Sequence, residues 1–285
     1  MAEVKAFVNS KGGVAKTTSV YSIAGELASR IPRKNGRILK GDKILAIDCD
    51  KQKNLSFCFF GADDETTFGE RPRNTFYDFL AGEDEEVTAK ALWQSRGNAN
   101  PKYYGVDVMV ADKRLADAMA LMNIKGADDS EEEKAYLENL SRRFKRLVEN
   151  GGYKYILIDM PPSNKVLERI VFGALASNIV IPLSSDLFCV DGFNDIIEEI
   201  DEIRSANPYC KIDGAFFSRF YEHCGVDEYV RSELANNTKS LLRSHIPVAT
   251  DIRETPMFHR PITYYKFASK SKTCVKNLVD ELYGE

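Results

Sequence analysis

Short apolar runs alternate with longer stretches of helical periodicity along the chain, a pattern typical of βα units around a parallel sheet. The apolar runs predict about seven strands, near residues 4–9, 43–47, 106–111, 155–158, 179–183, 212–217 and 247–250. The periodic stretches predict helices over residues 17–30, 130–149, 191–206, 226–244 and 271–283. We therefore expect an α/β fold with a doubly wound, mostly parallel sheet and helices on both faces.

The domain organisation follows from the same pattern. Ser130 and Glu133 fit a capping box at the start of an acidic helix over about residues 130–149. Residues 61–101 mix acidic runs with Gly and Pro, which is typical of a surface excursion. Because parallel α/β domains often reach this length undivided, we expect the 285 residues to form a single domain.

Composition and charge narrow the possible functions. With 44% apolar and 29% charged residues, the chain can bury a sizeable core without disulfides or metals. Its longest apolar runs are far shorter than the roughly 18 residues of a membrane span, and its N-terminus lacks a signal-peptide core, so we expect a cytoplasmic protein. The net charge of −4 means that any nucleic-acid contact must be local.

The cysteines and histidines show no metal-binding spacing. None of the six cysteines belongs to a C-x-x-C pair, which favours reduced thiols over a disulfide framework; they are Cys49, Cys58, Cys189, Cys210, Cys224 and Cys274. The three histidines are isolated along the chain, and this spacing predicts no zinc site.

The strongest local signal is KGGVAKTT at residues 11–18, between a predicted strand and a predicted helix. Backbone N–H groups of such a loop converge on phosphate oxygens at the positive end of a helix dipole. Lys16 would reach the β and γ phosphates, and the Thr17 hydroxyl would bind Mg²⁺. The alternative is a glycine-rich turn beside surface lysines that binds no nucleotide. The remaining candidate nucleotide contacts are Gly12, Gly13, Val14, Ala15 and Thr18.

Two positions differ from the ordinary phosphate loop, G-x-x-x-x-G-K-[ST]. Lys11 opens the loop and Ala15 precedes Lys16, so the run resembles the deviant Walker A motif, K-G-G-x-x-K-[ST], of the ParA/MinD family of dimerising ATPases. The resemblance implies that Lys11 reaches the phosphates of the partner's nucleotide. Ala15 stands where this family more usually has glycine, so its Cβ is expected to tighten or tilt the loop and slow turnover.

A second segment, ILAIDCDKQKNLS at residues 44–56, is similar to switch I of this family. The similarity implies that Asp48 lies in the second shell of the magnesium and that Asp50 positions the attacking water. Lys51 and Lys53 stand where the family commonly has proline and glycine. From the residues alone, carboxylates at the carboxyl end of a strand face the ligand crevice of an open α/β sheet, and solvated turn aspartates are the alternative.

The third segment, YKYILIDMPPS at residues 153–163, resembles the Walker B strand and implies a metal role for Asp159. Near the C-terminus, TDIRETP at residues 250–256 is similar to the family stretch that passes the adenine and the dimer face, which makes Arg253 and Pro256 candidate nucleotide contacts. YKFASK at residues 265–270 resembles the pattern before the last helix in ParA rather than in MinD.

The segment 231–276 holds nine basic and three acidic residues within an acidic chain. A local phosphate-backbone patch requires such an asymmetry, although a solvated basic face has it too. ParA proteins bind DNA without sequence preference through this region, so the resemblance implies DNA contacts. The candidates are Arg231, Lys239, Arg243, Lys266, Lys270 and Lys272. The acidic C-terminal end disfavours a membrane anchor.

Taken together, the resemblance implies a ParA-like ATPase that uses ATP and Mg²⁺, with Lys11, Lys16 and Asp50 as catalytic residues. It implies an ATP-dependent homodimer that binds DNA non-specifically, associates with the nucleoid and segregates a plasmid or chromosome. A ParB-like centromere-binding partner would stimulate its slow hydrolysis. Two alternatives stay open: a ParA-like ATPase that positions a protein cargo such as a microcompartment, and a metabolic P-loop enzyme of the same fold.

Overall fold

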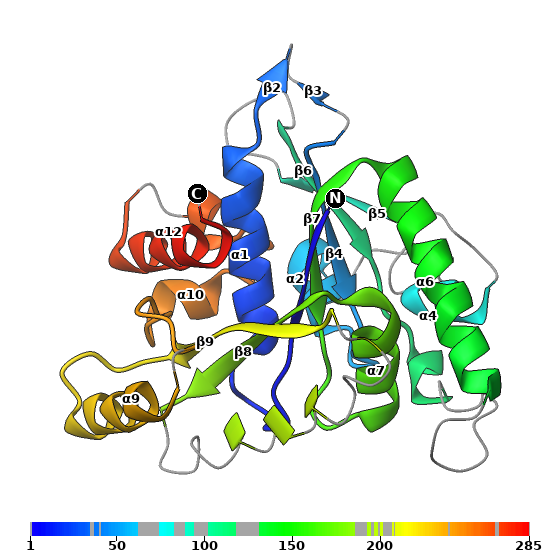
Figure 1. The fold of residues 1–285 in the computed structure, drawn as a ribbon. Helices are drawn as coiled ribbons and strands as arrows, with labels where there is room; N and C mark the ends of the chain where they lie inside the picture. The colour runs from blue at the N-terminus through cyan, green and yellow to red at the C-terminus, as the bar shows by residue number, and fades with distance from the viewer. Residues whose placement is uncertain are drawn as a thin grey trace.

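The computed structural model describes residues 2–34, 37–39, 41–61, 74–82, 89–93, 102–117, 131–185, 209–238, 240–265 and 268–284, with short pieces between 193 and 207. Its centre is a seven-stranded sheet of order β5-β6-β4-β7-β1-β8-β9 (Figure 1). The strands are β1 (Glu3–Phe7), β4 (Lys43–Asp48), β5 (Ala89–Trp93), β6 (Lys102–Met109), β7 (Tyr153–Asp159), β8 (Asn178–Ser184) and β9 (Lys211–Arg219). A separate two-stranded ribbon joins β2 (Arg33–Lys34) to β3 (Arg37–Ile38).

Six of these strands run parallel, and only the edge strand β5 is antiparallel to its neighbour β6. The burial pattern of β7, with six of its seven residues buried, explains why its sequence is almost continuously apolar. A strand covered on both faces has no solvent side on which polar residues could alternate. The predicted doubly wound, mostly parallel sheet is therefore confirmed.

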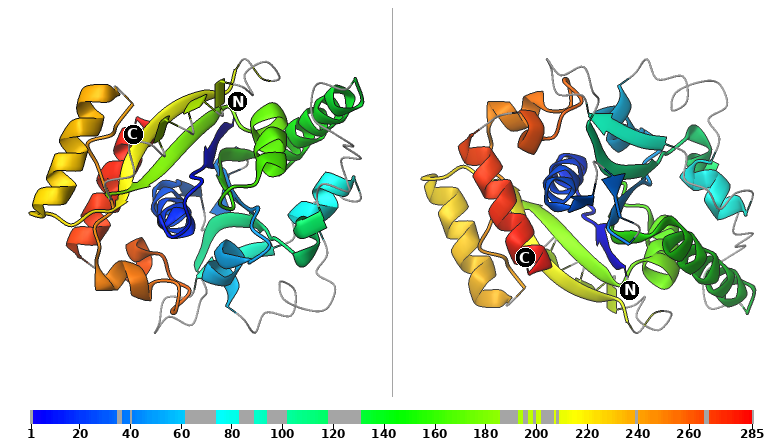
Figure 2. Two further views of the ribbon diagram at one scale, coloured as in Figure 1. Left: turned by 90° about the horizontal axis from the view of Figure 1, so that it is seen from below. Right: turned by 90° about the horizontal axis from the view of Figure 1, so that it is seen from above.

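Helices cover both faces of the sheet, as Figure 2 shows from two opposite ends. One apolar cluster joins the sheet to α1 (Lys16–Arg30), α2 (Asn54–Phe60), α10 (Thr250–Glu254), α11 (Ile262–Tyr265) and α12 (Lys270–Tyr283). The other joins it to α4 (Phe76–Ala81), α6 (Glu131–Gly151), α7 (Lys165–Ile170), the π-helical turn Val171–Leu175 and α9 (Gly225–Asn237). This double cover leaves the strand ends as the place where polar groups can gather.

Two predicted elements near the C-terminal third are wrong. Residues 247–250 form no strand: Pro247 makes one isolated bridge to Phe220, and α10 begins at Thr250. Val248 N donates to Phe220 O at 3.0 Å, and the pairing stops there because α10 begins two residues later. The helix predicted over 226–244 ends at Asn237, because the chain turns back and Leu242 N–H donates to Ala215 O of β9 at 2.8 Å.

The segment 61–101, expected as a surface excursion, contributes two elements to the fold. Helix α4 starts at a capping box between Thr75 and Asp78 and buries Phe76 and Phe79 in the core. Strand β5 supplies the seventh strand of the sheet. Ser130, the expected cap of α6, and most of the helix expected over 191–206 lie outside the described residues.

The described part of the chain contains neither a candidate membrane-spanning helix nor a disulfide. None of its helices combines the length and apolarity needed to cross a membrane. Its five described cysteines form no disulfide, and Cys189 lies outside the described residues.

Candidate nucleotide-binding site

The loop between β1 and α1 lies at the carboxyl ends of the parallel strands, at the bottom of the view in Figure 1. Two of its residues have left-handed backbone, Gly13 at φ 77° and Ala15 at φ 54°. Ala15 precedes α1 and its side chain makes no capping hydrogen bond, so no side chain at that position competes for the first N–H groups of the helix. The loop therefore has the strand, turn and helix setting of an anion cradle.

Buried polar groups hold the start of this loop. The Asn9 amide donates from Nδ2 to Pro182 O of β8 at 2.7 Å, and its Oδ1 accepts from Lys11 N at 2.8 Å. Lys16 Nζ donates to Asn9 O at 2.8 Å and to Lys11 O at 3.1 Å. Asn9 thus ties the loop to the neighbouring strand, and Lys16 folds across the loop it follows.

The far side of the loop is held by β9 and by the segment after β7. The Ser218 hydroxyl donates to Val14 O, and Leu183 O lies 3.0 Å from the same Oγ as an alternative acceptor. Arg219 Nη1 donates to Gly13 O at 3.1 Å, and Ser163 Oγ donates to Ser10 O at 2.8 Å. When its carbonyls are engaged in this way, a phosphate loop presents its N–H groups rather than its oxygens to an anion.

Lys16 carries the buried positive charge of the site. Only 7% of the residue is exposed, and burial lowers the pKa of its ammonium group. The negative charges of Asp159, Asp50 and Glu168 oppose that shift. A desolvated ammonium among carboxylates interacts more strongly with added phosphate charge than an exposed lysine does.

Asp48 and Asp159 end two adjacent parallel strands, β4 and β7, where they are register partners. Thr17 Oγ1 donates to Asp159 Oδ2 at 2.7 Å, which joins the first turn of α1 to the end of β7. The pKa of Asp159 is raised well above its ordinary value, mainly by burial and secondly by the negative charge of Asp48. Among the described residues its buried Oδ1 has no hydrogen-bond partner.

These donors fit a hard divalent cation such as Mg²⁺. The Thr17 hydroxyl and the carboxylates of Asp48 and Asp159 lie where neighbouring strands end, and one buried oxygen of Asp159 has no hydrogen-bond partner among the described residues. Mg²⁺ prefers oxygen ligands and keeps several waters, so one or two carboxylates suffice for its site. A cation there would remove the electrostatic penalty that the two buried carboxylates impose on each other.

Asp48 is held by the backbone of the segment that follows it. Its Oδ2 accepts from Ser56 N at 2.8 Å and from Ser56 Oγ at 2.7 Å, while its Oδ1 accepts from Asp50 N at 3.1 Å. Burial outweighs these hydrogen bonds and raises the pKa of Asp48 to about 6. Asp48 therefore orders residues 48–56 around one buried carboxyl group.

Asp50 is half-buried, and its Oδ1 accepts from Gln52 N at 2.9 Å, which turns the chain towards α2. Lys53, at φ 58°, directly precedes that helix. Lys53 and Ala15 both stand at positions where the ParA/MinD pattern has glycine, and both adopt the left-handed backbone that glycine tolerates best.

The two candidate nucleotide contacts near the C-terminus lie close together in the sequence, on α10 and in the turn after it. Arg253 is exposed on α10, and Pro256 lies in the turn after it. This region packs on α1, where a Cβ on Gly25 would lie 2.2 Å from Pro261 Cβ, so Gly25 permits the close approach. Contact of Arg253 and Pro256 with adenine stays a prediction.

The structure brings some of the basic candidates together. The Arg231 guanidinium lies over the Phe220 ring at 5.3 Å and donates to Arg243 O. Lys270 pairs with Glu222, and Lys272 is half-buried near the start of α12. Lys239 and Lys266 lie outside the described residues.

Sequence reasoning missed four residues that hold the loop: Asn9, Ser163, Ser218 and Arg219. Asn9 could have been found, because it lies only two residues before the KGGVAKTT run. Ser218 and Arg219 had no local signal, since the predicted strand ended at residue 217 and its proximity to the loop is a property of the sheet order.

Comparisons with known proteins agree with this geometry. A family described as "AAA domain" matches residues 2–212. The chain is similar to the chromosome partitioning protein ParA of Caulobacter vibrioides, with 29% identity over 268 residues that cover 92% of this chain and 86% of that protein.

Two solved structures show the same fold. McdA of Cyanothece in an ATP complex has a TM-score of 0.73 and 16% identity, with 99% of this chain and 96% of that chain covered. Cobyrinic acid a,c-diamide synthase of Mycobacterium smegmatis, with a bound ATP analogue and magnesium, has a TM-score of 0.70 and 23% identity, with 98% and 93% covered. At these identities the likeness concerns the fold.

Proposed function

The chain belongs to the AAA domain family and is a ParA-type P-loop ATPase, and from this premise we propose that it binds ATP with Mg²⁺ in the loop at residues 11–18 and hydrolyses it. The observation that carries the proposal is the Thr17–Asp159 hydrogen bond of 2.7 Å beside the buried Lys16. It joins a phosphate loop to a buried carboxylate at the point where a nucleotide's metal is held in P-loop proteins.

Each residue of the site has a distinct task in this proposal. The loop N–H groups and Lys16 bind the phosphates, while Thr17 and Asp159 hold the metal and its water shell, with Asp48 behind them. Mg²⁺, when bound, neutralises charge on the phosphates. Asp50 orients the attacking water. Ser218 and Arg219 keep the loop carbonyls turned away from the phosphates.

The nucleotide cycle would control assembly and DNA binding. Lys11 reaches the nucleotide of a second copy, so ATP favours a homodimer. Two copies then present their basic segments to one duplex, and doubling the phosphate contacts converts weak binding into strong, salt-sensitive binding. A ParB-like centromere-binding partner stimulates an otherwise slow hydrolysis and resets the switch, which segregates a plasmid or chromosome on the nucleoid.

Sedimentation of the purified protein with ATP, with ADP and without nucleotide tests the assembly step. We expect a dimer only with ATP in the wild type, and a monomer that still binds ATP in Lys11→Ala. Lys51→Ala, which removes an exposed lysine near Asp50, is the matched control and should dimerise normally. A wild-type mass that does not respond to ATP would contradict the switch, and a normal dimer in Lys11→Ala would contradict the role of Lys11.

A further inference from the structure

Three metal-ligating side chains meet beyond the end of β9. Glu222 follows β9, His245 precedes α10, and Cys274 lies in α12. One ligand atom from each lies within 4.8 Å of the others, and His245 Nε2 lies 3.1 Å from Glu222 Oε1. The residues are separated in the sequence, and only the return of the chain along β9 brings them together.

The backbone around this cluster is held in place. Ile246 N donates to Phe217 O at 2.8 Å, and Phe220 N donates to Ile246 O at 3.1 Å, which fixes the two segments that carry Glu222 and His245. The His245 ring packs on Phe220 with the ring centroids 4.7 Å apart. In α12, Val275 directly follows Cys274 and is fully buried, which holds this part of the helix against the core. The three donors therefore come from ordered elements.

We propose that Glu222, His245 and Cys274 form a binding site for a thiophilic transition-metal ion of the Zn²⁺ type. One thiolate, one imidazole and one carboxylate are the ligand types that zinc takes in proteins, and three protein ligands leave a fourth position for water. At zinc bond lengths the ligand atoms of a tetrahedral site lie roughly 3.3–3.6 Å apart. His245 Nε2 and Glu222 Oε1, now 3.1 Å apart in a hydrogen bond, need to separate only slightly to reach that spacing, so Cys274 has the main adjustment to make.

The protonation states are compatible with such an ion. Burial lowers the pKa of His245, which favours the neutral imidazole that a metal requires. Burial also raises the pKa of the Cys274 thiol, so the metal-free thiol carries its proton. When zinc binds, a Zn–S bond replaces the S–H bond and the proton leaves to solvent. Mg²⁺ prefers oxygen ligands, so the site with a thiolate and an imidazole should select a different metal ion from the site at Asp159.

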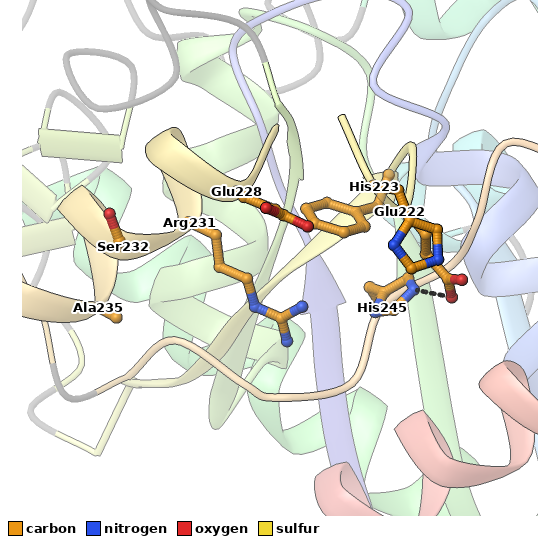
Figure 3. A pocket seen from close by; sticks show the side chains of 8 residues that line it. Glu222, His223, Glu228, Arg231, Ser232, Ala235 and His245 are labelled. Carbon is orange, nitrogen blue, oxygen red and sulfur yellow. Dashed lines mark hydrogen bonds and ion pairs between the residues drawn. The ribbon is translucent and has the colours of Figure 1, made fainter. Parts of the chain in front are cut away.

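Charged neighbours surround the cluster from each element. Lys270 of α12 pairs with Glu222 Oε2 and leaves Oε1 to face His245. Arg231 and Glu228 of α9 line the adjoining pocket, where Figure 3 shows Glu222, His223 and His245 gathered at one end. The thiolate and the carboxylate balance the charge of the ion, and Lys270 orients the carboxylate as a second partner. The site stands independently of the proposed nucleotide cycle.

Cobalt titration of the full-length protein in excess Mg²⁺ is the direct test. We expect a thiolate-to-Co²⁺ charge-transfer band that saturates at one equivalent and is displaced by Zn²⁺. Cys274→Ser should lose the band and weaken Zn²⁺ binding by more than about tenfold, since even loss of a partner outside the ligand set typically costs about 10–100-fold. Cys224→Ser, which removes a similarly half-buried thiol outside the cluster, should behave as wild type.

Glu222→Gln provides a second variant that keeps the thiol. It should retain the charge-transfer band but bind Zn²⁺ more weakly, with an unchanged circular dichroism spectrum. Absence of the band in the wild type would overturn the proposal. So would a band that survives in Cys274→Ser, or Zn²⁺ affinity that is equal in wild type, Cys274→Ser and Glu222→Gln.

Discussion

The phosphate loop and the basic C-terminal segment are built in opposite ways. At the loop, Lys16 and Asp159 are buried, and carbonyl groups accept hydrogen bonds from β9 and from the segment after β7. In the C-terminal segment, Arg231 covers an aromatic ring, and Lys270 pairs with Glu222 while 68% exposed. The phosphate loop is therefore a preorganised site. The basic C-terminal segment is a charged surface, and some of its basic side chains also make contacts with neighbouring residues of the same chain.

The difference predicts how each region responds to substitution. A preorganised site loses most of its function when one buried group is removed, because that group acts without reorganisation in a place shielded from water. A charged surface loses affinity in small, nearly additive steps that depend on salt. Substitutions in the two regions should therefore differ in size and in salt dependence.

Lys16→Ala should have the largest effect on activity. Loss of one preorganised charge at the phosphates typically costs about 10²–10³-fold in rate. Steady-state ATP hydrolysis measures it, with circular dichroism to verify folding and the exposed Lys51→Ala as the control. Activity within tenfold of wild type would show that this loop does not carry the chemistry.

Asp159→Asn should separate function from stability. It should abolish Mg²⁺-dependent nucleotide binding, yet raise the free energy of unfolding without Mg²⁺ by about 1–3 kcal/mol, because it removes the charge of a buried carboxylate and its repulsion with Asp48. Urea denaturation with and without Mg²⁺ measures both. A variant less stable than wild type in metal-free buffer would contradict this account of the charge balance.

Ser218→Ala should loosen the loop from β9. The change leaves Val14 O without its side-chain donor, and an unsatisfied buried acceptor costs about 1–3 kcal/mol. Nucleotide affinity should fall by at least about fivefold, as measured by calorimetry. Ser232→Ala, at an exposed serine of α9, is the control. Equal affinities in the two variants would mean that β9 does not order the loop.

Ala15→Gly should stabilise the protein modestly and raise turnover. A non-glycine residue at φ 54° costs about 1 kcal/mol of folding free energy relative to glycine. The midpoint temperature of thermal unfolding should therefore rise in Ala15→Gly. Lys53→Gly, at a second left-handed position, tests the backbone effect outside the phosphate loop. If Ala15→Gly destabilises the protein, surrounding contacts rather than strain determine this residue.

The smallest effects are expected on the basic face. Arg243→Ala should lower the slope of log affinity for DNA against log salt by roughly one, the change for one lost phosphate contact. Lys270→Ala should change it less, since Lys270 is paired with Glu222. Lys145→Ala on α6 is the exposed control. Unchanged slopes in both test variants would identify a solvated face.

The sequence predicted the parts of the fold whose signal is local. Strands such as β7 are continuous apolar runs, and the phosphate loop needs particular residue types at fixed spacing. Strand β5 was missed because it lies in a segment rich in polar, Gly and Pro residues. The strand expected at 247–250 was wrong because a short apolar run cannot reveal that the chain enters α10 at Thr250 after a single bridge to Phe220.

The candidate sites divide in the same way. The aspartates at the ends of β4 and β7 could be placed, since parallel strands align their carboxyl ends. Ser218 and Arg219 could not, because their approach to the loop depends on β9 lying next to β8. The expectation of no zinc site rested on the isolation of the histidines in sequence, whereas the cluster of Glu222, His245 and Cys274 exists only in the folded chain.

Binding of random-sequence duplex DNA with ATP, with ADP and without nucleotide, repeated across a salt series, tests the central claim most directly. If ATP drives a dimer that joins two basic faces on one duplex, binding will be strong only with ATP and will fall steeply with salt. Equal binding in all three nucleotide states, or none in any, would contradict the coupling between the phosphate loop and the basic C-terminal segment.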